Sequence, residues 1–466
     1  MKTNRMAMTV TPEIRSIVIF MLALYQSMSR PSSLMPVVLL VVSAAGFSAS
    51  PEDTQTKGHR VGLGDHRDQY ELETYTTQSE AILPLGSGIG AEGSERTEVY
   101  DREVAWLGLP GPVLMLDPKE VALGRDLFFD RRLSANGTLS CGMCHIPEQG
   151  FTQQELSTPV GHEGRSVRRN APSLYNVAFR SMLFLDGREE SLVAQVWSPL
   201  LAENEMANNS RTAVLSRIAT ISDYDQRFSR LYPNGLTDKT LGSAIAAYER
   251  SLVAANSPFD QWYFQTTSVD AAKGANYPAE RPIASPEQSL SPEALAGFAV
   301  FTRQGCASCH SMDESFALFS DGQFHNTGVG YLRVNKAIQP ARVQIAPGTF
   351  VEPDVSVETT TLSDFGRREV TSLASDQWRY RTPSLRNVSV TAPYMHDGSI
   401  GTLEEVVRFY EQGGGGDPKQ DPRVQPFSLT HEERSSLVKF LESLTSSYVH
   451  KLAGSARAAG IRDTGD

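Results

Sequence analysis

The sequence predicts an all-α fold of two tandem domains with long loops. Three observations support this class. A Cys-x-x-Cys-His pattern occurs twice, at residues 141–145 and 306–310, and a segment with helical apolar spacing precedes each copy. Helix start signals recur along the chain without alternating strand patterns between them. The length of 466 residues exceeds one ordinary core, so two domains and extensions are expected.

The repeated pattern is the attachment signature of c-type haem. The two thiols add across the haem vinyl groups, and the adjacent histidine lies under the iron as its proximal ligand. Paired zinc knuckles are the alternative. A redox CxxC or a zinc site needs no trailing histidine, however, so the two histidines favour haem. We therefore expect two cytochrome c-like haem domains with two covalently bound haem c groups. Their attachment residues are Cys141, Cys144, His145, Cys306, Cys309 and His310, which include all four cysteines of the chain.

Composition and charge narrow the function class. Apolar residues make up 40% of the chain and charged residues 21%, which are values typical of a globular protein. The net charge is −11, and no run of Lys and Arg stands out. Nucleic-acid binding is therefore not expected. An acidic surface suits a basic redox partner, although it also serves solubility alone.

The N-terminus is typical of an export signal. Residues 37–47 form an apolar run that follows Arg30, is short for a membrane span and ends in small residues. Met28 would be a usual start, and cleavage is expected between Ala45 and Ser50. An uncleaved anchor is the alternative. We expect a periplasmic protein with no stable membrane span after signal cleavage, and export agrees with haem attachment, which takes place outside the cytoplasm.

Start signals place the main helices. An N-cap followed by proline predicts helices from Asp117 and Ser291, and capping boxes predict helices from Thr402 and Thr430. Further helices are expected over 191–197 and 241–255, and residues 266–290 are typical of a connector. The expected organisation is a signal peptide or apolar segment at 1–50, a polar linker at 51–103, an N-terminal haem domain at 104–287, a C-terminal haem domain at 288–450 and a disordered tail at 451–466.

From about Leu116 to Leu444 the chain resembles the bacterial di-haem cytochrome c peroxidase and MauG family. Beyond the haem motifs, the resemblance rests on ordered segments of matching sequence, which lie at residues 123–133, 169–173, 186–188, 199–206, 381–387 and 392–398. It implies a di-haem oxidoreductase that uses hydrogen peroxide. It also implies exchange of electrons with a protein substrate or a small redox protein, either a cytochrome c or a cupredoxin.

The resemblance assigns residues to the N-terminal haem, where the family binds peroxide. Glu205 matches the carboxylate over the iron, and Gln195 lies ten residues before it, as in the family. A carboxyl in a dry pocket can move a proton between the two peroxide oxygens. The alternative is that Glu205 is a surface residue of a polar loop. His162 matches a removable distal ligand of the peroxidases, with a solvated loop histidine as its alternative.

The resemblance places the distal ligand of the second haem fourteen residues after His396, at Tyr410. The peroxidases carry methionine there and MauG carries tyrosine. Thioether sulfur favours ferrous iron and suits collecting electrons, whereas an anionic phenolate favours higher oxidation states. This favours a MauG-like enzyme that passes oxidising equivalents outward to a protein. The alternative is an ordinary core tyrosine whose hydroxyl is satisfied.

The resemblance also implies one Ca²⁺ between the domains, at positions that match Asn170, Thr391 and Pro393, and oxygen ligands suit that ion. Two positions depart from the family. Leu185 replaces a tryptophan between the haems, and Gln304 replaces the tryptophan that MauG carries before its second haem motif. The leading hypothesis is a MauG-like oxidoreductase. The alternatives are a cytochrome c peroxidase that reduces hydrogen peroxide to water and a non-catalytic electron-transfer cytochrome.

Overall fold

The computed structural model describes residues 106–111, 114–271, 289–335, 343–346, 349–351 and 364–460. The expected signal peptide and polar linker lie outside the described residues, as does most of the connector. Among the described residues, none of the helices combines the length and the apolar character that crossing a bilayer requires.

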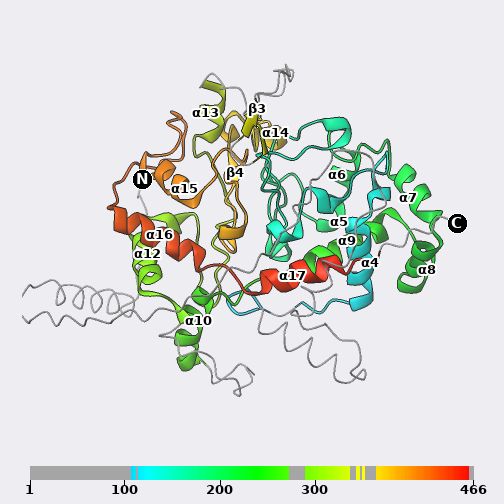
Figure 1. Cartoon of the computed structure of the whole chain (residues 1–466), viewed down its shortest axis with the longest axis horizontal. Helices are drawn as coiled ribbons and strands as arrows, with labels where there is room; N and C mark the ends of the chain where they lie inside the picture. Colours follow the sequence, from blue (N-terminus) through cyan, green and yellow to red (C-terminus); the bar gives the residue numbers. More distant parts are fainter. Residues whose placement is uncertain are drawn as a thin grey trace, which may run out of the picture. The chain divides into compact units, whose positions relative to one another are not determined.

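Helices are the main regular structure of the described residues, and the elements appear in Figure 1. The α-helices are α4 (Pro118–Phe129), α5 (Leu192–Gln195), α6 (Trp197–Leu201), α7 (Arg211–Ala219), α8 (Ser222–Leu231), α9 (Asp238–Ser251), α10 (Pro258–Ala271), α12 (Pro292–Arg303), α13 (Val329–Asn335), α14 (Arg368–Thr371), α15 (Leu403–Glu411), α16 (His431–Glu442) and α17 (Tyr448–Arg457). The helix expected over 191–197 is instead two short helices, α5 and α6, that meet at Val196.

The expected helix starts are confirmed at four positions. Asp117 caps α4 by accepting a hydrogen bond from the Lys119 backbone, and Ser291 caps α12 in the same way through Ala294. Thr402 and Thr430 begin α15 and α16 with complete capping boxes. Each cap satisfies backbone N–H groups that a helix start would otherwise leave unpaired.

The first haem motif lies beside a crossing of two helices. α4 packs on α9, and the two backbones approach at Gly124, where a side-chain carbon would overlap the Ala244 carbonyl oxygen. The apolar side of α4 buries Leu123, Leu127 and Phe128 in the core of this half. Because glycine has no Cβ, the helices can cross at this short distance.

The second half repeats the arrangement. α12 packs on α16, and Gly297 is the point of closest approach because a Cβ there would overlap the Ser436 carbonyl oxygen. A second apolar core surrounds this crossing and includes Phe301, Phe319 and Phe440. Each CxxCH motif thus follows the first helix of a crossed pair.

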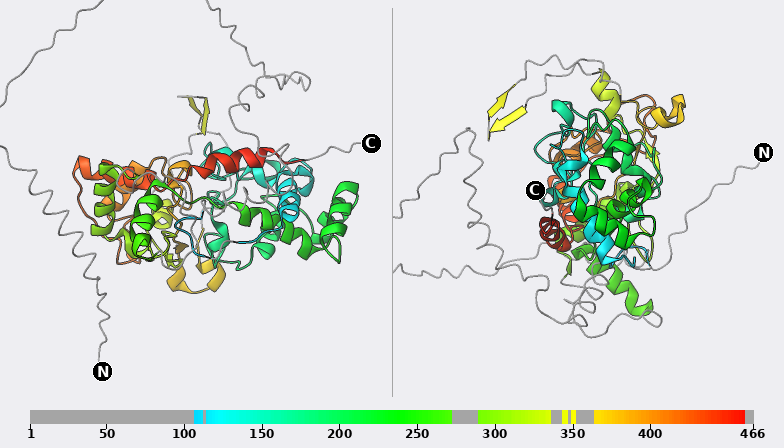
Figure 2. Two further views of the ribbon diagram at one scale, coloured as in Figure 1. Left: turned by 90° about the horizontal axis from the view of Figure 1, so that it is seen from below. Right: turned by 90° about the vertical axis from the view of Figure 1, so that its right-hand side faces the viewer.

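Two segments pack on the half to which they do not belong by sequence order. α10 lies before residue 288, where the second haem domain was expected to begin, and overlaps the start of the expected connector, yet Phe259 and Phe264 lie in the second core. α17 follows the last helix of the second half, yet Val449 and Ala456 lie in the first core. Figure 2 shows α17 running from the C-terminal half onto the N-terminal half. The expected domain boundaries stay a prediction, but the two cores are interlocked by these helices.

The expected disordered tail is wrong for its first part. Residues 451–457 belong to α17, and the segment is fixed to the N-terminal half by an ion pair of 2.7 Å between Arg457 and Glu148. The Gly460 backbone donates a hydrogen bond to Asp126 in α4. The small residues of this segment give only a weak helical pattern in the sequence. Its helix is stabilised by packing on the N-terminal half, which the sequence pattern does not reveal.

The described residues also contain strands, which the all-α prediction did not include. β1 (Phe324–His325) pairs antiparallel with β4 (Tyr380–Arg381), and β2 (Val343–Ala346) pairs with β3 (Thr349–Val351). In the first ladder Phe324 faces Arg381 and His325 faces Tyr380. This ladder is short, but it sets the backbone positions of His325, Tyr380 and Arg381, which line the cavity beside the second haem motif.

Candidate haem cavities

The first CxxCH motif forms a 3-10 turn, Cys141–Met143, and the His145 backbone closes it by donating to the Cys141 carbonyl. The His145 ring has Nδ1 2.9 Å from the Phe151 carbonyl oxygen. A carbonyl only accepts, so Nδ1 carries the proton and Nε2 keeps its lone pair. Burial lowers the pKa of His145, which keeps the ring neutral. A neutral, oriented imidazole is the form that binds a metal.

A cavity of about 550 Å³ lies against this motif. Cys144 and His145 border it, and so do Gln195 and Glu205. Gln195 is the last residue of α5, and Glu205 lies in a turn after α6 that the hydrogen bond from Glu205 N to the Ala202 carbonyl closes. The structure therefore brings both candidate catalytic residues to the cavity of the first haem motif. The volume falls in the range of small-molecule and cofactor sites.

The environment of Glu205 favours its neutral form. Burial raises the pKa of this carboxyl, and the nearby positive charge of Arg188 acts in the opposite direction. Glu205 is half-buried and borders the cavity, so it is not an isolated surface residue. A buried carboxyl with a raised pKa is a stronger base than an exposed one, which suits accepting a proton during a reaction.

His162 lies next to this site but outside the cavity lining that the described residues form. Its backbone N–H donates to the Glu205 carbonyl at 2.9 Å, and its ring Nε2 lies 3.5 Å from Glu163 Oε1. Its ring thus contacts a neighbour in its own loop.

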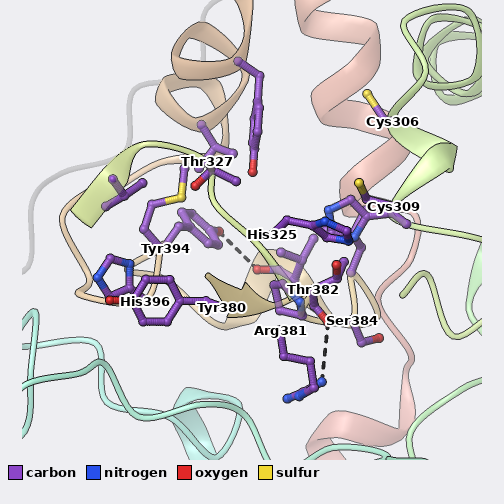
Figure 3. A pocket seen from close by; sticks show the side chains of 18 of the residues that line it. Cys306, Cys309, His325, Thr327, Tyr380, Arg381, Thr382, Ser384, Tyr394 and His396 are labelled. Atoms are coloured by element: carbon purple, nitrogen blue, oxygen red, sulfur yellow. Dashed lines mark hydrogen bonds between the residues drawn. The ribbon is translucent and has the colours of Figure 1, made fainter. Parts of the chain in front are cut away.

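The second CxxCH motif repeats the geometry of the first. It forms the 3-10 turn Cys306–Ser308, and His310 Nδ1 lies 2.9 Å from the Phe319 carbonyl oxygen. Burial lowers the pKa of His310, so this ring is also neutral with Nε2 unprotonated. Figure 3 shows Cys306, Cys309 and His325 on one side of the adjoining cavity and Tyr380 with His396 on the other.

Tyr410 borders this second cavity of about 310 Å³ together with His310. The α15 capping box fixes the helix start, and the buried residues Leu403 and Val407 orient the helix on the second core. Burial raises the pKa of the Tyr410 phenol, and the thiols of the haem motif add to this effect. Met395 lies in the same cavity lining and offers a thioether sulfur.

The three positions that match the calcium ligands also border the second cavity. Asn170 is buried, and its Nδ2 donates to the Ser157 carbonyl at 2.9 Å. This bond does not use the amide oxygen Oδ1, which is the atom that could bind a cation. The Asn170 backbone N–H donates to the His396 carbonyl, a contact between the two halves. Thr391 and Pro393 lie in sequence between Val388 and Leu403 of the second core. These residues offer only oxygen donors, which suits Ca²⁺.

Sequence patterns assigned no role to several charged residues that border the cavities. His325 lies between two carboxylates, with Nε2 2.8 Å from Asp321 and Nδ1 2.8 Å from Asp421. Cys309, Asp321 and His325 lie close enough to share a metal ion, but Cys309 is already the expected haem attachment. Asp321 lies four residues before His325, but Asp421 lies 96 residues after it, so spacing along the chain could not have found the full arrangement.

Glu249 of α9 is a second carboxyl at the first cavity. It is 6% exposed, and its Oε2 has no hydrogen-bond partner among the described residues. Burial raises the pKa of Glu249 to about 8. Its only signal in the sequence was a glutamate on the apolar side of a predicted helix.

The two positions that depart from the family both border a cavity. Leu185 borders the first and the second cavity, and its carbonyl accepts a hydrogen bond of 2.8 Å from the Arg381 backbone. Gln304 borders the second cavity. Neither side chain has a ring that could accept an electron.

Comparisons with known proteins point to one family. The model described as di-haem cytochrome c peroxidase matches residues 118–268. The chain is 32% identical over 334 residues to the methylamine utilization protein MauG of Methylorubrum extorquens, which covers 71% of this chain and 79% of that protein. It is 33% identical over 336 residues to a cytochrome-c peroxidase of Denitromonas iodatirespirans, covering 70% and 81%.

Among solved structures, a MauG-like protein associated with microbial copper homeostasis has a TM-score of 0.57 at 26% identity, covering 76% of this chain and 98% of that chain. The relatives thus carry two names, MauG and cytochrome-c peroxidase, at similar identity.

Proposed function

The chain belongs to the di-haem cytochrome c peroxidase and MauG family, whose members are di-haem oxidoreductases, and we propose that it is a MauG-like enzyme. In this proposal hydrogen peroxide reacts at the first cavity, and the oxidising equivalents leave from the second cavity to a partner protein. The observation that carries it is the oxygen donor Tyr410 in the lining of the cavity beside His310.

The residues of each motif fit covalent haem. The first cavity is bordered by the Cys144 thiol and the second by the thiols of Cys306 and Cys309. Each also has a neutral imidazole whose Nδ1 is held by a carbonyl. We propose that Cys141 and Cys144 hold one haem and that Cys306 and Cys309 hold the other, with His145 and His310 as proximal ligands. When bound, the haems supply peroxide activation and the storage of oxidising equivalents. Attachment of this kind accords with export to the periplasm.

Glu205 is the proposed proton carrier of the first cavity. Burial raises the pKa of its carboxyl, which makes it a better proton acceptor than an exposed glutamate. Gln195 borders the same cavity and offers an amide to orient a peroxide oxygen. The position of His162 outside the cavity lining supports a first iron that is open to peroxide without removal of a ligand.

Tyr410 is the proposed distal ligand of the second haem. Burial makes its phenol hard to ionise without a cation, and a ferric iron in the cavity would supply that charge. An anionic oxygen ligand disfavours the ferrous state, so this centre suits holding an oxidising equivalent. We further propose a Ca²⁺ at Asn170, Thr391 and Pro393, which joins the halves through oxygen donors.

The second candidate function is a cytochrome c peroxidase that takes electrons from a small cytochrome or cupredoxin. Two observations favour it. Met395 places a sulfur in the lining of the second cavity, where a thioether would raise the potential. Gln304 favours it as well, because it replaces the tryptophan through which MauG would pass oxidising equivalents to its protein substrate. A non-catalytic electron-transfer cytochrome requires both irons to be closed to peroxide.

The resting optical and EPR spectra test these candidates. We expect one high-spin and one low-spin ferric haem and no methionine-to-iron charge-transfer band. Tyr410→Phe should alter the low-spin signal. Tyr394→Phe is the matched control, because Tyr394 borders the same cavity but its hydroxyl donates to the Val388 carbonyl.

A methionine band, or a low-spin signal unchanged in Tyr410→Phe, would favour the peroxidase. Rapid oxidation of a reduced small cytochrome by peroxide would do the same. Two low-spin haems inert to peroxide would identify an electron carrier.

A further inference from the structure

Two arginines lie where the two haem cavities meet, and neither has a carboxylate partner among the described residues. Arg180 borders both cavities, and Arg381 borders the second. Arg180 donates to the Ser173 carbonyl at 3.0 Å, and Arg381 donates to the Phe184 carbonyl at 3.2 Å. An arginine has five N–H donors, so most of the donors of Arg180 are left for another acceptor.

Arg381 is buried and Arg180 is half-buried, and the two guanidinium groups act on each other. Arg381 is 5% exposed, and Figure 3 shows its side chain leaving β4 away from the Cys306 and Cys309 thiols. Burial and the nearby charge of Arg381 lower the pKa of Arg180 to about 9. Two like charges that are withdrawn from water without a counter-ion destabilise the folded state. The Arg180 and Arg381 guanidinium groups therefore lack a negatively charged partner among the described residues.

Other buried arginines of the chain show the contrast. Arg169 lies 2.6 Å from both Asp186 and Asp364, and Arg386 lies 2.8 Å from Asp260. These pairs satisfy the usual rule that enclosed charges are paired. Arg180 and Arg381 break the rule at the border of the cavities that the cofactors would fill.

A haem brings the missing charge, because its two propionate groups are carboxylates. We propose that Arg180 and Arg381 bind haem propionates at the border between the two cavities, and that Arg180, which faces both cavities, electrostatically couples the two haems. The pair lies beside Leu185, whose carbonyl accepts from the Arg381 backbone. The arginine pair thus lies beside the position at which Leu185 replaces the tryptophan of the family. The inference rests on the proposed attachment of two haems.

The consequence is a dependence of both haem potentials on one side chain. A positive charge near a haem favours the ferrous state, which carries one positive charge less than the ferric state. Removing Arg180 should therefore lower both potentials, whereas removing Arg381 should lower mainly that of the haem at His310. A unit charge roughly 10 Å away in a medium of effective dielectric about 20 changes such an equilibrium by about tenfold or more.

The test uses the full-length holoprotein with Arg180→Gln and Arg381→Gln. Haem per chain is measured first, by absorbance of the pyridine adduct, so that failure of attachment is distinguished from failure of the inference. Redox titration then gives the two potentials, and resonance Raman spectra give the propionate bending bands. Arg230→Gln is the control, because this exposed arginine of α8 contacts only Gln226 among the described residues.

We expect both potentials to fall in Arg180→Gln, one mainly in Arg381→Gln and none in Arg230→Gln, with shifted propionate bands in the first two variants. Unchanged potentials and bands in a variant that retains two haems would overturn the inference. If Arg180→Gln does not retain two haems, Arg180→Lys keeps the charge but loses the planar fork. It should shift a propionate band at nearly unchanged potentials, and an unshifted band would overturn the inference.

Discussion

At the scale of the residue, burial sets the protonation state of the groups that border the cavities. It lowers the pKa of His145 and His310, so that both rings are neutral. It raises the pKa of Glu205 and raises the pKa of Glu249 to about 8, which shifts both carboxyls toward the protonated form. The same physical effect therefore prepares two imidazoles for metal binding and keeps proton donors beside one of them.

Glu205→Gln removes the proton carrier and keeps the shape of the side chain. Steady-state peroxide turnover should fall by about 100-fold or more, because general acid–base catalysis contributes factors of this size. Both haems should remain attached, as their absorbance would report. Glu203→Gln is the matched control, since this residue is exposed two positions earlier. Turnover equal to that of the parent enzyme would remove Glu205 from the mechanism.

Glu249→Gln tests the second carboxyl through the pH dependence of stability. The raised pKa of about 8 means that the folded protein binds this proton more tightly than the unfolded chain does. The parent protein therefore loses stability as the pH rises from about 4.5 to 8, and the glutamine variant avoids this loss. Its advantage in the free energy of unfolding should grow to roughly 1–3 kcal/mol by pH 8.

Thermal melts of both proteins at pH 5 and pH 8 measure that difference. Glu190→Gln, which removes an exposed carboxyl, serves as control. A melting difference that is the same at both pH values would show that Glu249 ionises normally.

Sequence patterns predict some of these residues and miss others for a definable reason. The CxxCH motifs carry their chemistry within five residues, so they can be read directly. Arg180 and Arg381 are about two hundred residues apart, and nothing near either one indicates that its carboxylate partner is missing. A missing counter-ion is a property of the folded environment.

At the scale of the element, each haem motif depends on a crossed helix pair with glycine at the contact. The helices and their caps were predictable, because N-cap residues and apolar spacing are local signals. The role of Gly124 and Gly297 was not, because the carbonyl that excludes a side chain belongs to a helix more than a hundred residues away. α17 escaped prediction for the same reason.

Gly124→Ala should destabilise the protein, because the added carbon would overlap the Ala244 carbonyl oxygen and force α4 away from α9. We expect a loss of more than about 2 kcal/mol, as for other overpacked sites. Gly454→Ala is the matched control within α17, since a Cβ there has open space. It should stabilise by up to about 1 kcal/mol through helix propensity. Thermal or denaturant unfolding measures both, and equal effects would refute the close crossing.

At the scale of the whole molecule, contacts that pass between the halves hold the two cavities next to each other. Arg169 of the first half bridges to Asp364 of the second at 2.6 Å. α17 returns from the second half to the first core, where Tyr175 donates to the Val449 carbonyl. Fold class and haem number were predictable from the repeated motif, whereas this interlocking depends on surfaces that only the folded halves present.

Calcium binding should add to this connection. The folded protein offers Asn170 and two backbone carbonyls from distant segments, and the unfolded chain does not hold them together. A ligand at 100 times its dissociation constant stabilises the folded state by about 2.7 kcal/mol. We therefore expect added Ca²⁺ to raise the melting temperature of the parent protein and a chelator to lower it.

Asn170→Ala should remove this calcium dependence, whatever its own effect on the melting temperature. The buried amide of Asn170 also donates to Ser157, so the variant is expected to start from a lower stability. The informative quantity is thus the difference between melts with Ca²⁺ and with chelator. Asn209→Ala, at an exposed position, should keep the full difference. A parent protein that melts identically in both conditions has no calcium between its halves, and the side-chain and α17 contacts alone then hold them in register.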